Sequence, residues 1–180
     1  MKALLPLCLF SLGASSLRAQ VRSEASLEAC KKFAQSFYDW YAGNDQKELR
    51  GKTQITPWGA AIKYRPHSFS GEIVRALTKA DAKGETEKDA VLDFDPILNT
   101  QDPADHYVVR RVSYKSNTCR AEVYGVWSRP VSDQGKRPQV VAEMAFEAGR
   151  WHFVNFHYPN STNPENENLL AILKYQYQPK

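Results

Sequence analysis

The sequence of 180 residues lacks the short motifs that mark common catalytic and cofactor sites. It has no Gly-Xaa-Ser-Xaa-Gly turn, no Walker phosphate loop, no dinucleotide-binding glycine fingerprint and no zinc-ligand spacing. It also lacks internal repeats and an apolar run long enough to cross a membrane. The composition, with 42% hydrophobic and 24% charged residues, is typical of one ordinary globular domain. An enzyme is not excluded, because a site can be built from scattered residues.

An excess of charge of one sign is absent as well. The chain has 24 basic and 20 acidic residues, and two of the basic ones, Lys2 and Arg18, lie within the first 19 residues. Taking these 2 from 24 leaves 22 basic against 20 acidic residues, a net charge of +2 for the remainder. Nucleic-acid binding requires a dense basic stripe. The sequence therefore predicts no nucleic-acid partner.

The first 19 residues are organised like a secretory signal peptide. Lys2 precedes a short apolar segment, 3–12, and small residues follow before Ala19. We expect cleavage near Ala19, so that residues 20–180 form one mature domain that is periplasmic or secreted. Contact with a membrane is then expected only through the cleaved signal peptide.

Cysteine is scarce, with three in the whole chain. Loss of Cys8 with the signal peptide leaves Cys30 and Cys119, which are 89 positions apart. An oxidising compartment favours a disulfide between them. The alternative is two unpaired buried cysteines, which behave as small hydrophobic side chains.

In the mature chain, the sequence predicts helices in the N-terminal half. Residues 24–42 form an amphipathic helix, with Ser23 or Ser26 as N-cap and Gly43 as terminator. Its apolar stripe consists of Leu27, Cys30, Phe33, Ala34, Phe37 and Tyr41. Tyr38 and Trp40 lie off this stripe, which indicates a helix that is covered on more than one side or aromatic side chains at the rim of a pocket. Core packing is the favoured interpretation for both.

A second helix is predicted over 71–83. Ser70 is its N-cap, and Gly84 lies just beyond its expected end. The preceding segment, 44–68, contains turn signals and is compatible with either a short helix or a short strand.

The second half of the chain has the two-residue period of strands. Antiparallel strands joined by short turns are expected over 107–115, 119–128, 138–147 and 151–158. Asn163 and Pro164 are expected to open a short C-terminal helix through Leu173. A four-stranded sheet must bury one face, so the predicted fold class is α+β. We expect a curved antiparallel sheet of about four strands packed on N-terminal helices in a cone-like form, with a bend or bulge at Gly125.

The segment 91–103 is rich in carboxylates and amides, with Asp93, Asp95, Asn99, Gln101 and Asp102 within ten residues. Oxygen ligands of this kind suit a hard cation such as calcium, although the spacing is not that of an EF-hand loop. The favoured interpretation is that these side chains cap backbone groups in a rigid turn. We therefore predict no metal and no cofactor.

The same segment carries a resemblance to a known family. Asp93-Phe94-Asp95-Pro96, Leu98-Asn99 and Gln101-Asp102-Pro103, together with the aromatic runs 37–41 and 151–156, resemble the bacterial domain-of-unknown-function family 3828. Members of that family are small envelope proteins and lipoproteins. The resemblance implies an envelope location and a cone-shaped fold similar to nuclear transport factor two, and it implies no particular reaction.

Histidines in the last strand are candidate acid–base groups. Histidine as a residue type changes charge near neutral pH, which makes His152 and His157, with Asn155, candidates for this role near Glu122 or Glu143. Because these histidines are separated by an odd number of positions, a regular strand would send them to opposite faces of the sheet.

Arg110 and Arg111 follow one another in the first strand. Regular alternation places one guanidinium on each face of the sheet. An inward arginine would favour an anionic ligand, whereas a solvated strand arginine is the commoner case.

These features favour an exported non-enzymatic protein that binds a small ligand or an envelope-protein partner at the open end of the cone. The candidate binding residues are Tyr38, Trp58, Asp93, Asp95, Asn99, Asp102 and His157. One alternative is a hydrolase- or isomerase-like enzyme that uses a pocket Asp or His. Another is an inhibitor- or immunity-type protein.

Overall fold

The computed structural model describes residues 25–43, 55–87, 92–129, 135–159, 161–163 and 167–176. The signal peptide predicted over 1–19 lies outside these ranges. Among the helices in the described ranges, none combines the length and the apolar character that a membrane span requires.

The N-terminal half is helical and the C-terminal half forms a sheet. The helices are α2 (Leu27–Ala42), α4 (Pro57–Tyr64), the short 3₁₀ helix η1 (Pro66–Ser68) and α5 (Gly71–Glu87). They are followed by β1 (His106–Lys115), β2 (Thr118–Val126), β3 (Val140–Glu147), β4 (Arg150–His157) and α6 (Leu169–Gln176). The strands form one antiparallel sheet in the order β1-β2-β3-β4. The predicted α+β class and four-stranded antiparallel sheet are confirmed.

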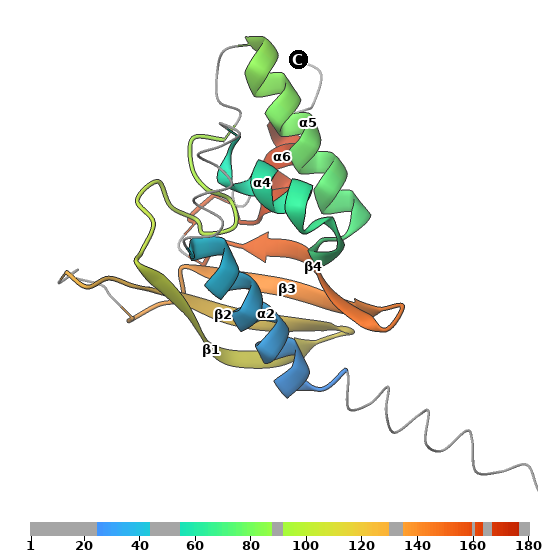
Figure 1. The fold of residues 1–180 in the computed structure, drawn as a ribbon, viewed down its shortest axis with the longest axis vertical. Coiled ribbons are helices and arrows are strands. Elements are labelled where there is room, and N and C mark those ends of the chain that lie inside the picture. Colours follow the sequence, from blue (N-terminus) through green and yellow to red (C-terminus); the bar gives the residue numbers. More distant parts are fainter. Residues whose placement is uncertain are drawn as a thin grey trace, which may run out of the picture.

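The sheet is curved and unclosed, and α2 lies across one of its faces, while α4, α5 and α6 gather beyond the β4 edge (Figure 1). We call the face toward α2 the inner face and the opposite one the outer face. Along β2, Cys119, Ala121 and Val123 are buried on the inner face. The intervening side chains, such as Arg120 and Glu122, point to the outer face, as strand alternation requires.

Helix α2 begins at Leu27 because the Ser26 hydroxyl accepts a hydrogen bond from the Ala29 N–H at 3.1 Å. Of the two predicted N-caps, Ser26 is therefore the one used. The helix ends at Gly43, whose N–H donates to the Trp40 carbonyl, as expected. Its buried side chains face the sheet and include Cys30, Ala34, Phe37, Tyr38 and Tyr41.

The undecided segment contains α4 and η1. The Thr56 hydroxyl accepts from the Gly59 N–H at 3.0 Å, and Pro57 occupies the first helical turn. In α5, Ser70 accepts from the Ile73 N–H as predicted. The prediction that this helix stops before Gly84 is wrong, because α5 continues to Glu87. A glycine inside a helix costs only about 1 kcal/mol, too little to end it alone.

The C-terminal helix starts later than predicted. It begins at Leu169, where the Asn168 side chain accepts from the Ala171 N–H at 3.0 Å, and not at Asn163. Pro164, part of the predicted start, lies outside the described residues. Asn168 is also held against β4 by a bridge to His157, which fixes where the helix can begin.

Two bulges alter which side chains share a face of the sheet. In β1, Val109 pairs with Val123 and Val112 pairs with Ala121, so two residues of β1 stand opposite Glu122 alone. These two residues are Arg110 and Arg111, and both therefore lie on the outer face. The prediction of one arginine on each face is wrong.

The second bulge lies in β4. Asn155 pairs with Glu143 and Phe153 pairs with Met144, so one residue of β4 is left over between them. Beyond the extra residue, the alternation of side chains between the two faces of β4 is shifted by one position. His152 and His157 consequently share the outer face, contrary to the prediction.

No bulge occurs at Gly125, where one was predicted. Gly125 pairs in regular register with Tyr107. A Cβ at this position would lie 2.5 Å from Gln139 Oε1 and 3.0 Å from Ala104 Cβ. Glycine is required here by close packing, not by a break in the register.

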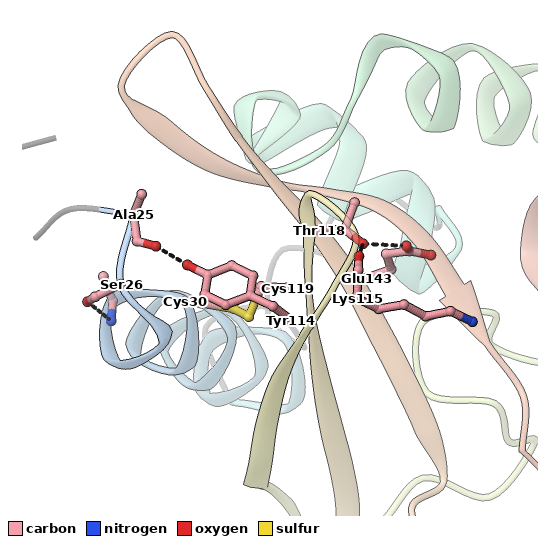
Figure 2. Close-up of a disulfide and its surroundings, with 9 residues drawn as sticks. Ala25, Ser26, Cys30, Tyr114, Lys115, Thr118, Cys119 and Glu143 are labelled. Atoms are coloured by element: carbon pink, nitrogen blue, oxygen red, sulfur yellow. Dashed lines mark hydrogen bonds between the residues drawn. A yellow bond between two sulfur atoms is a disulfide. The ribbon is translucent and has the colours of Figure 1, made fainter. Parts of the chain in front are cut away.

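The predicted disulfide is confirmed. Cys30 of α2 and Cys119 of β2 are bonded, with their Cα atoms 6.7 Å apart (Figure 2). The bond ties α2 to the inner face of the sheet, and both cysteines are fully buried. Nearby, the Tyr114 hydroxyl donates to the Ala25 carbonyl.

The disulfide links residues that are 89 positions apart, and the loop-entropy argument gives a stabilisation of about 4–5 kcal/mol for a loop of this size. We expect the paired replacement Cys30→Ala with Cys119→Ala to lower the free energy of unfolding by up to this amount, measured by denaturant titration. Reduction of the wild-type protein should give a similar loss, and the paired variant should be insensitive to reductant. Equal stability of the oxidised and reduced wild-type protein would contradict this role.

Candidate functional site

The Asp95 carboxylate organises the acidic segment. Its Oδ1 accepts hydrogen bonds from the Ile97 N–H at 2.9 Å and the Leu98 N–H at 3.1 Å, while its Oδ2 accepts from the Tyr41 hydroxyl at 2.8 Å. The Asp95 N–H donates to the Thr100 carbonyl at 2.9 Å, which closes the turn. Asp95 is 7% exposed. Its carboxylate therefore serves as an internal cap of the turn, with little surface to offer a ligand.

Tyrosines from distant segments hold the same loop. The Tyr38 hydroxyl donates to the Ile97 carbonyl, the Tyr158 hydroxyl donates to the Pro96 carbonyl, and the Tyr107 hydroxyl accepts from the loop at Ala104. Burial raises the pKa of all three tyrosines well above the usual value, and the negative charge of Asp95 adds to the shift. The side chains expected to line an open end, Tyr38 and Asp95, are thus packed inside the protein.

The other predicted residues of the segment lie nearer the surface. Asp93 is exposed, and Asp102 is exposed and forms an ion pair with Arg129 at 2.5 Å. The Asn99 amide donates to the Gln139 carbonyl at 2.9 Å, and its φ of 53° places it in the left-handed region that Asn tolerates. Among the residues that the structure describes, no three His, Cys, Asp or Glu side chains converge in the manner of a metal site.

Trp58 lies in α4, partly buried against the hydrophobic core. Its indole N–H is buried and has no hydrogen-bond acceptor within the described ranges. His157 lies on the outer face of β4 and Tyr38 packs on the inner side, so the structure does not bring the predicted residues together into one site.

His157 belongs to what we call the Glu143 cluster, formed by Thr118, Arg120, Glu143 and His157. His157 Nε2 lies 2.5 Å from one oxygen of Glu143. The Thr118 hydroxyl donates to the other oxygen at 2.6 Å, as Figure 2 shows. Arg120 is 3.3 Å from Glu143. Burial alone would raise the pKa of Glu143, but the hydrogen bonds from Thr118 and His157 and the charge of Arg120 outweigh it, so the pKa is lowered.

A histidine–carboxylate pair can move protons, and this one matches the predicted proximity of His157 to Glu143. The hydroxyl in the cluster, however, donates to Glu143 and not to the imidazole. His157 is therefore not placed to take a proton from Thr118, as general-base activation of a nucleophile would require.

The two arginines of the β1 bulge are already engaged on the outer face. Arg111 forms an ion pair with Glu122 at 2.6 Å, and the Tyr124 hydroxyl also donates to Glu122. The Arg110 guanidinium lies over the Tyr124 ring at 4.3 Å and donates to the Gly135 carbonyl. Neither arginine points into the protein toward a ligand.

A groove of about 340 Å³ runs between α2 and η1. We call it the α2 groove. It is lined by Ala29, Lys32, Phe33, Ser36, Phe37, Arg65 and Ser68. The α2 residues recur at three- and four-residue steps, so they share one face of that helix.

No residue predicted as a binding candidate lines the α2 groove. Arg65 ends α4, where its N–H donates to the Ala61 carbonyl at 2.8 Å, and its guanidinium lies over the Trp40 ring at 4.2 Å. Burial lowers the pKa of Arg65. Trp40, which Arg65 covers, lies off the apolar stripe of α2; core packing is the favoured prediction for that position, so the sequence carries no clear signal of this groove.

Comparisons of the chain with protein-family models, curated proteins and solved structures give no match. The resemblance to family 3828 accordingly stays a prediction.

Asp95→Ala removes the acceptor of three buried donors. We expect it to lower the free energy of unfolding by about 2–4 kcal/mol, because buried donors without a partner cost about 1–3 kcal/mol each and part of this is recovered by water. Tyr41→Phe, which removes one of the donors, should cost about 1 kcal/mol. Chemical denaturation checks both values. A melting temperature that rises with calcium and falls with a chelator would show instead that the segment holds a cation.

The lowered pKa of Glu143 predicts that the free energy of unfolding depends on pH. Its pKa in the folded protein lies below the ordinary value of 4.5, so the ionised carboxylate stabilises the folded state above about pH 4.5. This contribution is lost as the pH falls through the folded-state pKa. We expect Glu143→Gln to be less stable than wild type at pH 7 and to lose less stability on acidification, as measured by denaturant titrations across pH. Glu147→Gln is the control and should stay close to wild type, because this side chain of the same strand is 72% exposed and its contact with His152, at 3.5 Å, is a surface ion pair. Parallel pH profiles for Glu143→Gln and wild type would contradict the assignment.

Proposed function

We propose that the protein is an exported, non-enzymatic binding protein that holds a small ligand in the α2 groove. The observation that carries this proposal is the groove itself, which combines an apolar floor with a polar rim. Its volume of about 340 Å³ falls within the range of small-molecule sites. Phe33, which is partly buried, supplies the apolar contact, whereas Phe37 is 1% exposed and belongs to the core; Lys32, Ser36 and Arg65 supply polar groups that can orient a ligand.

Export is supported by the Cys30–Cys119 disulfide, because such bonds persist in oxidising compartments. The predicted signal peptide and the resemblance to envelope proteins point the same way. A periplasmic or secreted location is part of the proposal.

The enzyme alternative is favoured by one observation, the contact between His157 and Glu143. Against it, the cluster contains no hydroxyl placed next to the imidazole, and neither His157 nor Glu143 is among the residues that line the α2 groove. Binding of a protein partner over the groove, as in an inhibitor-type protein, uses the same surface and is distinguished from ligand binding by experiment.

The test is a nuclear magnetic resonance screen of the mature protein, with a panel of small carboxylates, alcohols and amines that carry apolar groups. We expect amide signals of residues 29–37 and 65–68 to shift. Ser36→Trp should abolish the shifts by filling the groove, because Ser36 is exposed and the larger ring can enter without disturbing the core. Ser113→Trp, at an exposed position of β1, is the matched control and should bind as wild type.

Two results would overturn the proposal. One is a panel in which no compound shifts the groove signals. The other is hydrolysis or isomerisation of a substrate by the purified protein, lost in His157→Ala.

A further inference from the structure

We propose that the α2 groove selects a small amphipathic anion, an apolar chain or ring that carries one carboxylate, phosphate or sulfonate group. This inference rests on the proposed function and names the ligand class of the same site. The features that carry it are two cations without carboxylate partners beside an aromatic floor.

The charge of the groove has one sign. Of the residues that line it in the described part of the chain, Lys32 and Arg65 are the charged ones, and both are cationic. Within the same part of the chain, neither is ion-paired with a carboxylate. Lys32 is exposed at the rim, so it can reach an anion without leaving the helix surface.

Arg65 is the better anchor, because it is partly buried and its surroundings fix it. Its carbonyl accepts from the Ser68 N–H at 2.9 Å, so its backbone is bonded on both sides. Its guanidinium rests on Trp40. A partly buried cation without a counter-ion is held at a desolvation cost, which a bound anion offsets. The planar guanidinium can also donate two parallel hydrogen bonds to a carboxylate or phosphate.

The apolar part of the ligand has a rigid surface to contact. The Phe37 ring packs edge-on against Phe153 at 4.7 Å between centroids and against Phe69 at 5.4 Å. Phe33 also packs on Phe153, at 5.1 Å. Phe37 is 1% exposed, so the surface offered to a ligand is that of Phe33. Because Phe33 packs on the core, this surface exists before a ligand arrives. Ser36 and Ser68 add hydroxyl donors between the floor and the cations.

Two neighbouring surfaces differ from the α2 groove in their charges. The adjoining depression along α2, of about 370 Å³, shares Lys32 and Ser36 with the α2 groove but also includes the acidic side chains Glu28 and Asp39. On the outer face of the sheet, Arg111 and Arg120 already have glutamate partners. An anion therefore finds unpaired cations beside an apolar surface at the α2 groove.

The experiment uses three probes with the same alkyl chain, octanoate, octanol and octyltrimethylammonium, titrated into the mature wild-type protein and followed by amide chemical shifts. We expect octanoate to shift the signals of residues 29–37 and 65–68 and to bind about tenfold more tightly than octanol, which corresponds to about 1.4 kcal/mol. Octyltrimethylammonium should bind more weakly than octanol. Raising the salt concentration should weaken octanoate binding and leave octanol unaffected.

Variants separate the charge from the apolar surface. Arg65→Gln and Lys32→Gln should each lower the affinity for octanoate about fivefold or more and leave octanol binding unchanged. Lys63→Gln, an exposed lysine of α4 outside the groove, is the matched control. Because Lys32 is exposed, its variant keeps the inference testable even if Arg65→Gln disturbs the fold.

The outcomes distinguish the two proposals. Equal affinities for octanoate and octanol overturn the anion inference and leave the proposed binding function standing. Octanoate shifts confined to the outer face of the sheet overturn the inference as well. If none of the three probes shifts the groove signals, both the inference and the groove as a small-ligand site are wrong.

Discussion

The structure depends on how helix α2 is fastened to the inner face of the sheet. Three of its side chains, spread along the helix, do this: Cys30 forms the disulfide to β2, Gln35 bonds the backbone of β1, and Tyr41 donates to Asp95. The Gln35 amide donates to one β1 carbonyl and accepts from one β1 N–H, so it satisfies the free edge of the sheet much as another strand would. A disulfide, a pair of side-chain hydrogen bonds to the edge strand and a hydrogen bond to a buried carboxylate thus hold this helix in one position.

Much of this architecture could be predicted, because it follows from periodicity. The apolar stripe of α2 and the alternation of the strands are local patterns, and the disulfide followed from two cysteines in an export context. The bulges could not be predicted, because two residues opposite one is a property of the pairing and leaves no mark in either strand alone. One extra residue in each of two strands was enough to place Arg110 beside Arg111 and His152 on the face of His157.

The candidate site was less predictable than the fold, for a related reason. The chemistry of the acidic turn was readable from Asp95 and its neighbours, yet the tyrosines that bury it come from α2, β1 and the end of β4. One wall of the α2 groove includes Arg65, whose guanidinium lies over the Trp40 ring. Arg65 belongs to the segment 44–68, for which the sequence did not decide between helix and strand. Phe33 counted as core by its spacing, whereas it also lines the groove. Sites assembled from segments far apart in the chain have no local signature.

The two sides of α2 are consequently coupled. The disulfide and the hydrogen bonds described above fix the side of α2 that faces the sheet. Because the helix is held there, Lys32 and Phe33, which form one wall of the groove, are also held in place. A ligand that enters a preformed groove loses little free energy in ordering it, so the affinity is decided by the few groups it contacts. On the outer face the glutamates Glu122 and Glu143 neutralise nearby arginines. The α2 groove thus presents two cations that have no carboxylate partner in the described part of the chain, whereas the ion pairs of Arg111 and Arg120 help to hold the sheet together.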